Sequence, residues 1–293
     1  MRTLGFTRRF FLLVTPLIAT SSLVTSPAQA ATLASSEGEF SLINFSLDPD
    51  VTATRNNANI STIAKGGEVS ATNNANIDFF NDPSEVINTS FSEAFGQNKN
   101  YLGLANAEGK VLGNFFVDAG ESFSVDFTAF LGLETSIDEP SAENAKASAD
   151  ISFLLFDTTD ITDPNLLDDF FDQVLSNPTS KIKKTPLDFF SLTANVNSFN
   201  DQDFITSRKS DYITLSNQDT QFNFGGNTEF AKALFQGSLK RSFTTPTNLT
   251  FIQVRRTQVK VSVPEPSTST ALLLLSVLVA VATKARLKKT ALT

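Results

Sequence analysis

The residues with the clearest capacity for chemistry are a run of spaced carboxylates. Asp157, Asp160 and Asp163 are separated by hydroxyl and apolar residues, and Asp168 and Asp169 follow them closely. Carboxylate oxygens could form the ligand shell of a calcium ion, which is available outside the cell. However, the spacing does not match an EF-hand loop. We therefore favour a structural interpretation, a turn followed by a helix cap, and keep a calcium site as the alternative.

Two residue types that carry most enzymatic chemistry are missing. The chain has no histidine and no cysteine. This excludes a Ser-His-Asp triad, histidine-ligated zinc, thiolate nucleophiles and disulfides. A carboxylate pair, as in glycoside hydrolases, or a Ser-Lys arrangement remains, and neither can be identified from spacing alone. We therefore predict a protein that is not an enzyme and that binds no cofactor.

Aromatic composition bears on sugar binding. The chain has no tryptophan, two tyrosines and 28 phenylalanines. Rings with a polar tip suit sugar binding, whereas phenylalanine is purely apolar. Most phenylalanines stand at inward positions of alternating segments, so we expect them to fill the core. This weakens a carbohydrate-binding interpretation without excluding it.

The first thirty residues have the three zones of a secretory signal peptide. Three arginines lie within the first nine residues, an apolar stretch covers 10–24, and small residues end the segment at Ala28 and Ala30. This layout predicts export, with cleavage after Ala30. Residues 7–12 also resemble the twin-arginine consensus, although Leu13 departs from it. We favour the ordinary export translocon, with folding after passage, over twin-arginine export of a folded chain.

The C-terminal end has three parts in a fixed order. A short motif is followed by the apolar run 271–282 and by a basic cluster at 284–289. The motif consists of Val263, Pro264, Glu265 and Pro266. The two prolines hold the chain extended. The 17 residues between the motif and the basic cluster make about 25 Å of helix, barely enough to span a membrane. The basic cluster is expected to remain in the cytoplasm.

This order of motif, apolar run and basic end resembles the PEP-CTERM sorting signal of bacterial exosortase substrates. The resemblance implies that an exosortase-type membrane enzyme cuts near residues 264–266. The precursor would be anchored in the inner membrane, and the product would reach the cell surface or the medium. Such proteins typically come from bacteria that make exopolysaccharide, including cyanobacteria, so exopolysaccharide is a candidate partner. The alternative is an unprocessed membrane anchor.

The charge distribution argues against nucleic acid as a partner. Of the 23 basic residues, three lie in the signal peptide and four in the tail, which leaves 16. All 31 acidic residues follow residue 30, so the remaining chain carries a net charge of 16 − 31 = −15. Such a surface repels phosphates and anionic lipid headgroups.

Alternation of apolar and polar residues dominates the chain between residues 40 and 263. This pattern predicts β-strands, and turn signals at 118–120, 225–226 and Pro246 separate them. The alternating segments are 123–133, 151–155, 212–215, 249–254 and 259–263. We predict an all-β domain over residues 31–260, an antiparallel β-sandwich or jelly roll. A signal peptide (1–30) and a sorting signal with a transmembrane helix (261–293) flank it.

One segment has the helical period instead. Asp163 suits an N-cap, Pro164 suits the first helical position, and apolar residues recur on one face before Pro178. We predict one amphipathic helix over 164–176, packed on the sandwich.

The sequence also contains a short repeat. Residues 56–60 read Asn-Asn-Ala-Asn-Ile and recur as residues 73–77. Stacked asparagine amides could bind a ligand. Two copies are too few for a solenoid, so we favour chance asparagine-rich turns or a duplicated hairpin.

These observations predict an exported, sorted surface or extracellular-matrix protein. Its β domain would have a non-enzymatic structural or adhesive role. The alternative is a calcium- or polysaccharide-binding module.

Overall fold

The computed structural model describes residues 31–81, 84–98, 100–140, 142–161, 163–176, 184–198 and 202–263. The predicted cleavage residues Ala28 and Ala30 lie outside these ranges. So do Pro264, Glu265 and Pro266 and the apolar run that follows them. Within the described ranges, no helix is long and apolar enough to cross a membrane.

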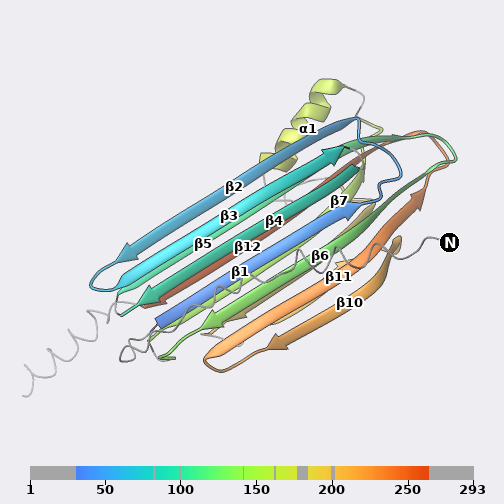
Figure 1. The fold of residues 1–293 in the computed structure, drawn as a ribbon. Coiled ribbons are helices and arrows are strands. Elements are labelled where there is room, and N and C mark those ends of the chain that lie inside the picture. Colours follow the sequence, from blue (N-terminus) through green and yellow to red (C-terminus); the bar gives the residue numbers. More distant parts are fainter. Residues whose placement is uncertain are drawn as a thin grey trace, which may run out of the picture.

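The described residues form two six-stranded antiparallel sheets that pack face to face (Figure 1). We call them sheet A and sheet B. The strands of sheet A are, in spatial order, β10 (Ile213–Asn223), β11 (Thr228–Ser242), β6 (Ser122–Ser136), β1 (Ala31–Ile43), β4 (Ser84–Gln97) and β3 (Glu68–Asn81). The strands of sheet B are β2 (Val51–Ala64), β5 (Tyr101–Val117), β12 (Thr247–Val263), β7 (Asn144–Asp157), β8 (Asp188–Asn197) and β9 (Phe204–Lys209).

The core lies between the sheets and is built from alternate residues of each strand. Phenylalanine rings from both sheets form its centre, as the sequence predicts. The Phe127 and Phe190 rings lie 4.7 Å apart, and those of Phe153 and Phe251 lie 5.1 Å apart. All four side chains are buried. Buried aromatic area of this kind is a main source of stability in a chain without disulfides.

The all-β prediction is confirmed, and one detail needs a correction. Segments 249–254 and 259–263 belong to one continuous strand, β12, which pairs with β5 and β7 along its length. This strand continues past residue 260, since Val261 and Val263 still pair with β5. The turn signals are in place. Gly120, Gly225 and Gly226 all have positive φ angles, which glycine adopts without strain.

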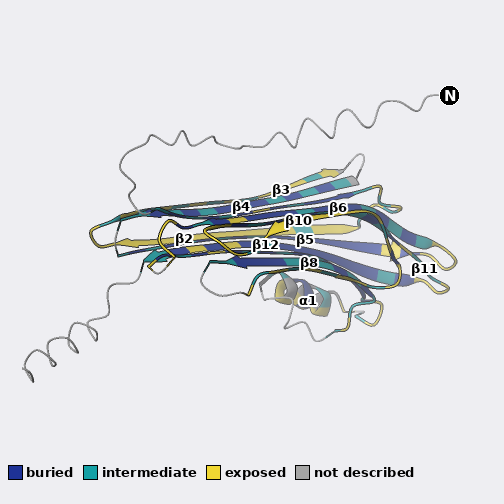
Figure 2. Ribbon diagram, turned by 90° about the horizontal axis from the view of Figure 1, so that it is seen from below, coloured by how far each residue is buried: buried dark blue, intermediate teal, exposed yellow. Residues whose placement is uncertain are grey.

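The predicted helix is present as α1 (Pro164–Ser176). It packs on the outer face of sheet B, where Figure 2 shows it beneath the strands. Phe170 and Phe171 contact an apolar patch that includes Leu112, Phe156 and Ile252. The helix therefore covers one part of this face and leaves the rest of it open.

The repeated pentapeptide does not form turns. Residues 56–60 lie within β2 and residues 73–77 within β3. These strands belong to different sheets, so they are not a hydrogen-bonded hairpin either. Asn73 instead joins the two sheets, because its Nδ2 donates to the backbone oxygens of Asn59 (2.9 Å) and Asn106 (2.8 Å). The interpretation of the two copies as turns is therefore wrong.

Candidate functional site

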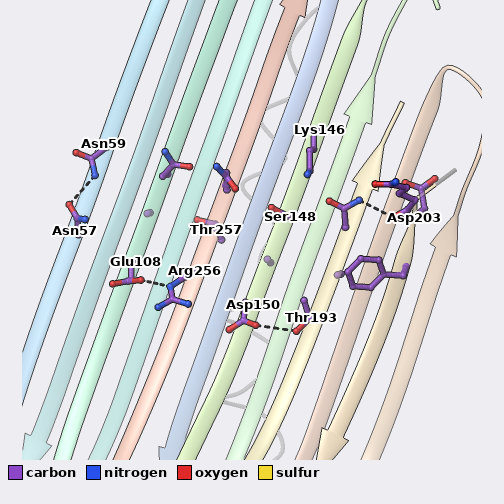
Figure 3. Close-up of a pocket in the computed structure, with 18 residues that line it drawn as sticks. Asn57, Asn59, Glu108, Lys146, Ser148, Asp150, Thr193, Asp203, Arg256 and Thr257 are labelled. Carbon is purple, nitrogen blue, oxygen red and sulfur yellow. Dashed lines mark hydrogen bonds and ion pairs between the residues drawn. The ribbon is translucent and has the colours of Figure 1, made fainter. Parts of the chain in front are cut away.

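The part of sheet B that α1 leaves open contains a groove of about 830 Å³. Its lining comes from all six strands of the sheet and from the segment before β9 (Figure 3). Beneath α1 the outward residues of β5, β7 and β12 are apolar, namely Leu112, Phe156 and Ile252. Further along the same strands the outward residues are polar, namely Glu108, Asp150 and Arg256. This change of character along the strands separates a packing surface from a polar surface.

The register of the strands arranges the groove residues in two rows across the sheet. The first row consists of Asn57, Glu108, Arg256, Asp150 and Thr193. The second row consists of Asn59, Asn106, Gln258, Ser148, Asn195 and Phe204. Neighbouring strands are about 4.8 Å apart, so each row offers a side chain at every such step.

Charge is concentrated in the first row. Arg256 Nε donates to Glu108 Oε2, and Lys110 Nζ lies 3.2 Å from Glu108 Oε1. Burial alone would raise the pKa of Glu108, but the hydrogen bond and charge of Arg256, together with Lys110, hold the pKa below its usual value. Glu108 is thus ionised at neutral pH and is held in place by two basic side chains.

The pKa of Asp150 is displaced in the opposite direction. Burial raises its pKa, while a hydrogen bond from Thr193 Oγ1 (3.1 Å) and the nearby charge of Arg256 act in the other direction. Two carboxylates whose pKa values are displaced in opposite directions can form a catalytic pair. Here Arg256 stands between Glu108 and Asp150 in the register and pairs with one of them. The first row is therefore better suited to forming ion pairs between its own side chains than to proton transfer.

The second row is rich in amides and hydroxyls. Asn59 Nδ2 donates to Asn57 Oδ1 (3.0 Å) and so links the two rows at β2. At the other side, Asn195 Nδ2 donates to the backbone oxygen of Gln202 (3.0 Å). Phe204 ends this row with 42% of its surface exposed. The row therefore combines hydrogen-bonding groups with one accessible apolar ring.

The structure does not gather the sequence-predicted acidic cluster into a metal site. Asp157 Oδ1 accepts from the Thr159 amide (2.9 Å), and Asp160 pairs with Lys184. The backbone oxygen of Asp163 accepts from the Leu167 amide (3.1 Å) at the start of α1. Among the described residues, no group of three or more acidic side chains could hold a metal ion.

The groove was missed at the level of sequence because its residues are scattered over the chain. Asn57 and Phe204 lie on the outermost strands of the sheet, and the residues between them come from four other strands. The repeat at 56–60 was the one available signal, since Asn57 and Asn59 line the groove. Comparison of the chain with protein-family models, curated proteins and solved structures found no match in any of the three.

Proposed function

We propose that this chain is an exported, exosortase-sorted surface or extracellular-matrix protein that acts without catalysis. Its β domain would be an adhesive module that binds a neutral, hydroxyl-rich polymer such as exopolysaccharide in the groove of sheet B. The observation that carries the binding part is the pair of polar rows across six strands, which ends at the exposed ring of Phe204.

An extended polymer suits this groove for geometrical reasons. A chain lying across the strands would meet a hydrogen-bonding side chain at each strand, about every 4.8 Å. Phe204 would offer an apolar face for a sugar ring. Basic and acidic side chains both line the groove, namely Lys146, Arg256, Glu108, Asp150 and Asp203. This mixture favours a neutral ligand over a polyanion or a polycation.

The sorting part of the proposal rests on the two sequence signals. β1 includes Ala31, the residue that follows the predicted export cleavage. β12 includes Val263, the residue before Pro264. Cleavage at the two predicted sites would therefore leave β1 and β12 intact.

Binding is tested with the exported protein and neutral β-glucan oligosaccharides as the probe, with polygalacturonate as the acidic comparison. The test variant is Asn59→Ala with Gln258→Ala. The matched control is Asn74→Ala with Asn76→Ala, the exposed second copy of the repeat on β3. We expect glucan binding that weakens at least tenfold in the test variant and is unchanged in the control. Equal affinity in all three proteins would exclude the groove as the binding site.

Sorting is tested by mass measurement of the mature protein from its native host. The expected chain starts at Ala31 and ends near residues 264–266. Replacement of Glu265 and both flanking prolines by alanine should leave the precursor in the inner membrane. A mature chain that still ends at Thr293 would contradict the sorting and leave a plain membrane anchor.

A further inference from the structure

Ala31, the residue that follows the predicted export cleavage, contacts a carboxylate. Ala31 opens β1, which lies inside sheet A between β4 and β6. Its backbone nitrogen donates to Asp138 Oδ2 at 2.9 Å. Asp138 belongs to the segment between β6 and β7, more than one hundred residues further along the chain. Ala31 is thus held by an acidic side chain that is distant in the sequence.

A second carboxylate, that of Glu143, contacts the backbone of Asp138. Glu143 is only 2% exposed, and its Oε2 accepts from the backbone amides of Asp138 (2.6 Å) and Glu139 (2.9 Å). Among the described residues, Glu143 Oε1 has no hydrogen-bond partner although it is buried. Buried carboxylate oxygens normally have partners, because an unsatisfied one costs free energy. We therefore expect Glu143 Oε1 to accept a hydrogen bond from a donor that is not among the described contacts.

Tyr101 completes the surroundings of this cluster. Its hydroxyl and Thr32 Oγ1 lie 2.5 Å apart and share a hydrogen bond. Burial raises the pKa of Tyr101 to about 12, and the negative charges of Glu143 and Asp138 add to the increase. Asp138, Glu143 and Tyr101 thus bring two carboxylates and a phenol close together, and the carboxylates give this cluster negative charge.

We propose that Asp138 and Glu143 form a binding site for the α-ammonium group that processing creates at Ala31. This inference rests on the proposed cleavage after Ala30. Hydrolysis of that peptide bond adds one water molecule and leaves a carboxylate on Ala30 and an amine on Ala31, which takes up a proton. One neutral N–H donor is thereby replaced by a charged group with three donors. A charged donor forms a stronger hydrogen bond with a carboxylate than a neutral amide does.

The consequence is a mature fold that is more stable than its precursor. In the precursor, the nitrogen of Ala31 is an amide and can satisfy one acceptor only. In the mature chain, the ammonium can keep its bond to Asp138 and supply further donors to the acidic cluster. Removal of the export peptide would then stabilise the N-terminal end of β1 once the protein has been exported.

The first experiment compares melting temperatures in two processing states. The full chain is expressed with its export peptide, and the N-terminus of the product is established by mass measurement. An uncleaved form is made by replacing Ala28 and Ala30 with leucine, and both forms are purified in the same detergent. We expect Asp138→Asn to lower the melting temperature of the processed form by about 2–4 °C. The shift in the uncleaved form should be less than half as large.

The control is Asp126→Asn, which removes a carboxylate on β6 that accepts from Asn44 and lies at the end of β1 far from Ala31. Its effect should be the same in both processing states. Equal effects of Asp138→Asn in the two states would overturn the inference.

The second experiment measures the pKa of the α-amino group itself, by ¹⁵N NMR of the unmodified N-terminus. Pairing with carboxylates should raise this pKa above the usual value of about 8, and Asp138→Asn should return it toward that value. A processed chain that starts at Ala31 but titrates at the usual value would overturn the inference and leave the proposed function intact. A mature chain that starts elsewhere would overturn the export cleavage and the inference together.

Discussion

Arg255 donates two hydrogen bonds to a single atom, Asn88 Oδ1, in the interior between the two sheets. The distances are 3.0 Å from Nε and 2.6 Å from Nη2, and both residues are fully buried. Arg255 Nη1 also donates to the backbone oxygen of Gly38 (3.2 Å), and Asn88 Nδ2 donates to Gln253 Oε1 (2.5 Å). Burial lowers the pKa of Arg255 to about 9, against a smaller opposing effect of Glu39. A neutral amide is thus the main partner of a buried cation.

The first prediction is that losing one partner of the Asn88–Arg255 pair costs more stability than losing both. Asn88→Ala removes the acceptor and leaves a buried guanidinium, which should cost about 3–5 kcal/mol. Joint replacement by Asn88→Leu and Arg255→Met removes both polar groups and should recover most of this loss, less the cost of Gln253 Oε1, which loses its donor. Denaturant unfolding of the variants gives the free energies. A double variant as unstable as Asn88→Ala would show that the guanidinium itself stabilises the fold.

The second prediction concerns Gly109, which makes room for the same pair. A Cβ atom there would overlap Asn88 Oδ1 and lie 3.0 Å from Arg255 Nη2. Gly109→Ala should therefore cost about 1–3 kcal/mol through overpacking. Gly38→Ala should cost less, because its Cβ would lie 3.3 Å from the flexible Arg255 stem. The cost of Gly109→Ala should shrink in an Asn88→Ala background, and additive costs would contradict this account.

These contacts mark the limit of what the sequence could predict. The helix at 164–176 was predictable from local sequence features, namely a candidate cap residue, a proline and a 3.6-residue period, and it is present at those residues. The strands depend on local alternation, which predicts their existence but not their partners. Asn88 and Arg255 are 167 positions apart, and only the order of strands in the two sheets brings them together. The two rows of the groove are non-local in the same way.

The third prediction is a stability optimum on the acid side of neutrality. Burial raises the pKa of Glu37, Glu39 and Glu93 on the outer face of sheet A, although Lys232 opposes the increase at Glu37. Each raised carboxylate contributes stability that is fully present below its usual pKa of 4.5 and is lost as pH rises through the higher folded-state pKa. The melting temperature should therefore be higher near pH 5 than near pH 7.5.

A variant separates this effect from general charge repulsion. Glu37→Gln with Glu39→Gln should raise the melting temperature at pH 7.5 and flatten its dependence on pH. Glu121→Gln removes a charge from an exposed turn and serves as the comparison. An equal pH dependence in the double variant and in the wild type would refute the assignment to these two side chains.

The fourth prediction concerns the acidic segment before α1. Asp157 and Asp160 have local partners, so millimolar calcium should not change the melting temperature. Asp163→Ala should still cost roughly 1 kcal/mol if Asp163 caps the helix as the sequence predicts. The measurement is thermal unfolding of both proteins with and without calcium. A calcium-induced increase that disappears in Asp157→Ala would establish a metal site there instead.

The fifth prediction concerns Lys110, which joins the groove to the helix. Its Nζ donates to the backbone oxygen of Leu175 in the last turn of α1 (3.0 Å) and pairs with Glu108. A cation at the C-terminal end of a helix is favourable because the exposed carbonyl oxygens there are partly negative. Burial lowers the pKa of Lys110, while Glu108 opposes that shift. Lys110 should therefore hold α1 against sheet B and position Glu108 in the groove at the same time.

Replacement of Lys110 by methionine keeps the length of the side chain and removes its charge. We expect faster hydrogen exchange in the last turn of α1 and an overall loss of about 1–3 kcal/mol, since the partly buried carbonyl of Leu175 and the Glu108 carboxylate each lose a donor. Glu108 should then depend on Arg256 alone, so glucan binding should weaken as well. Lys146→Met, at an exposed position of the groove, should leave exchange in α1 unchanged. Loss of binding in Lys110→Met without any change in helix exchange would separate the two roles and contradict the coupling between them.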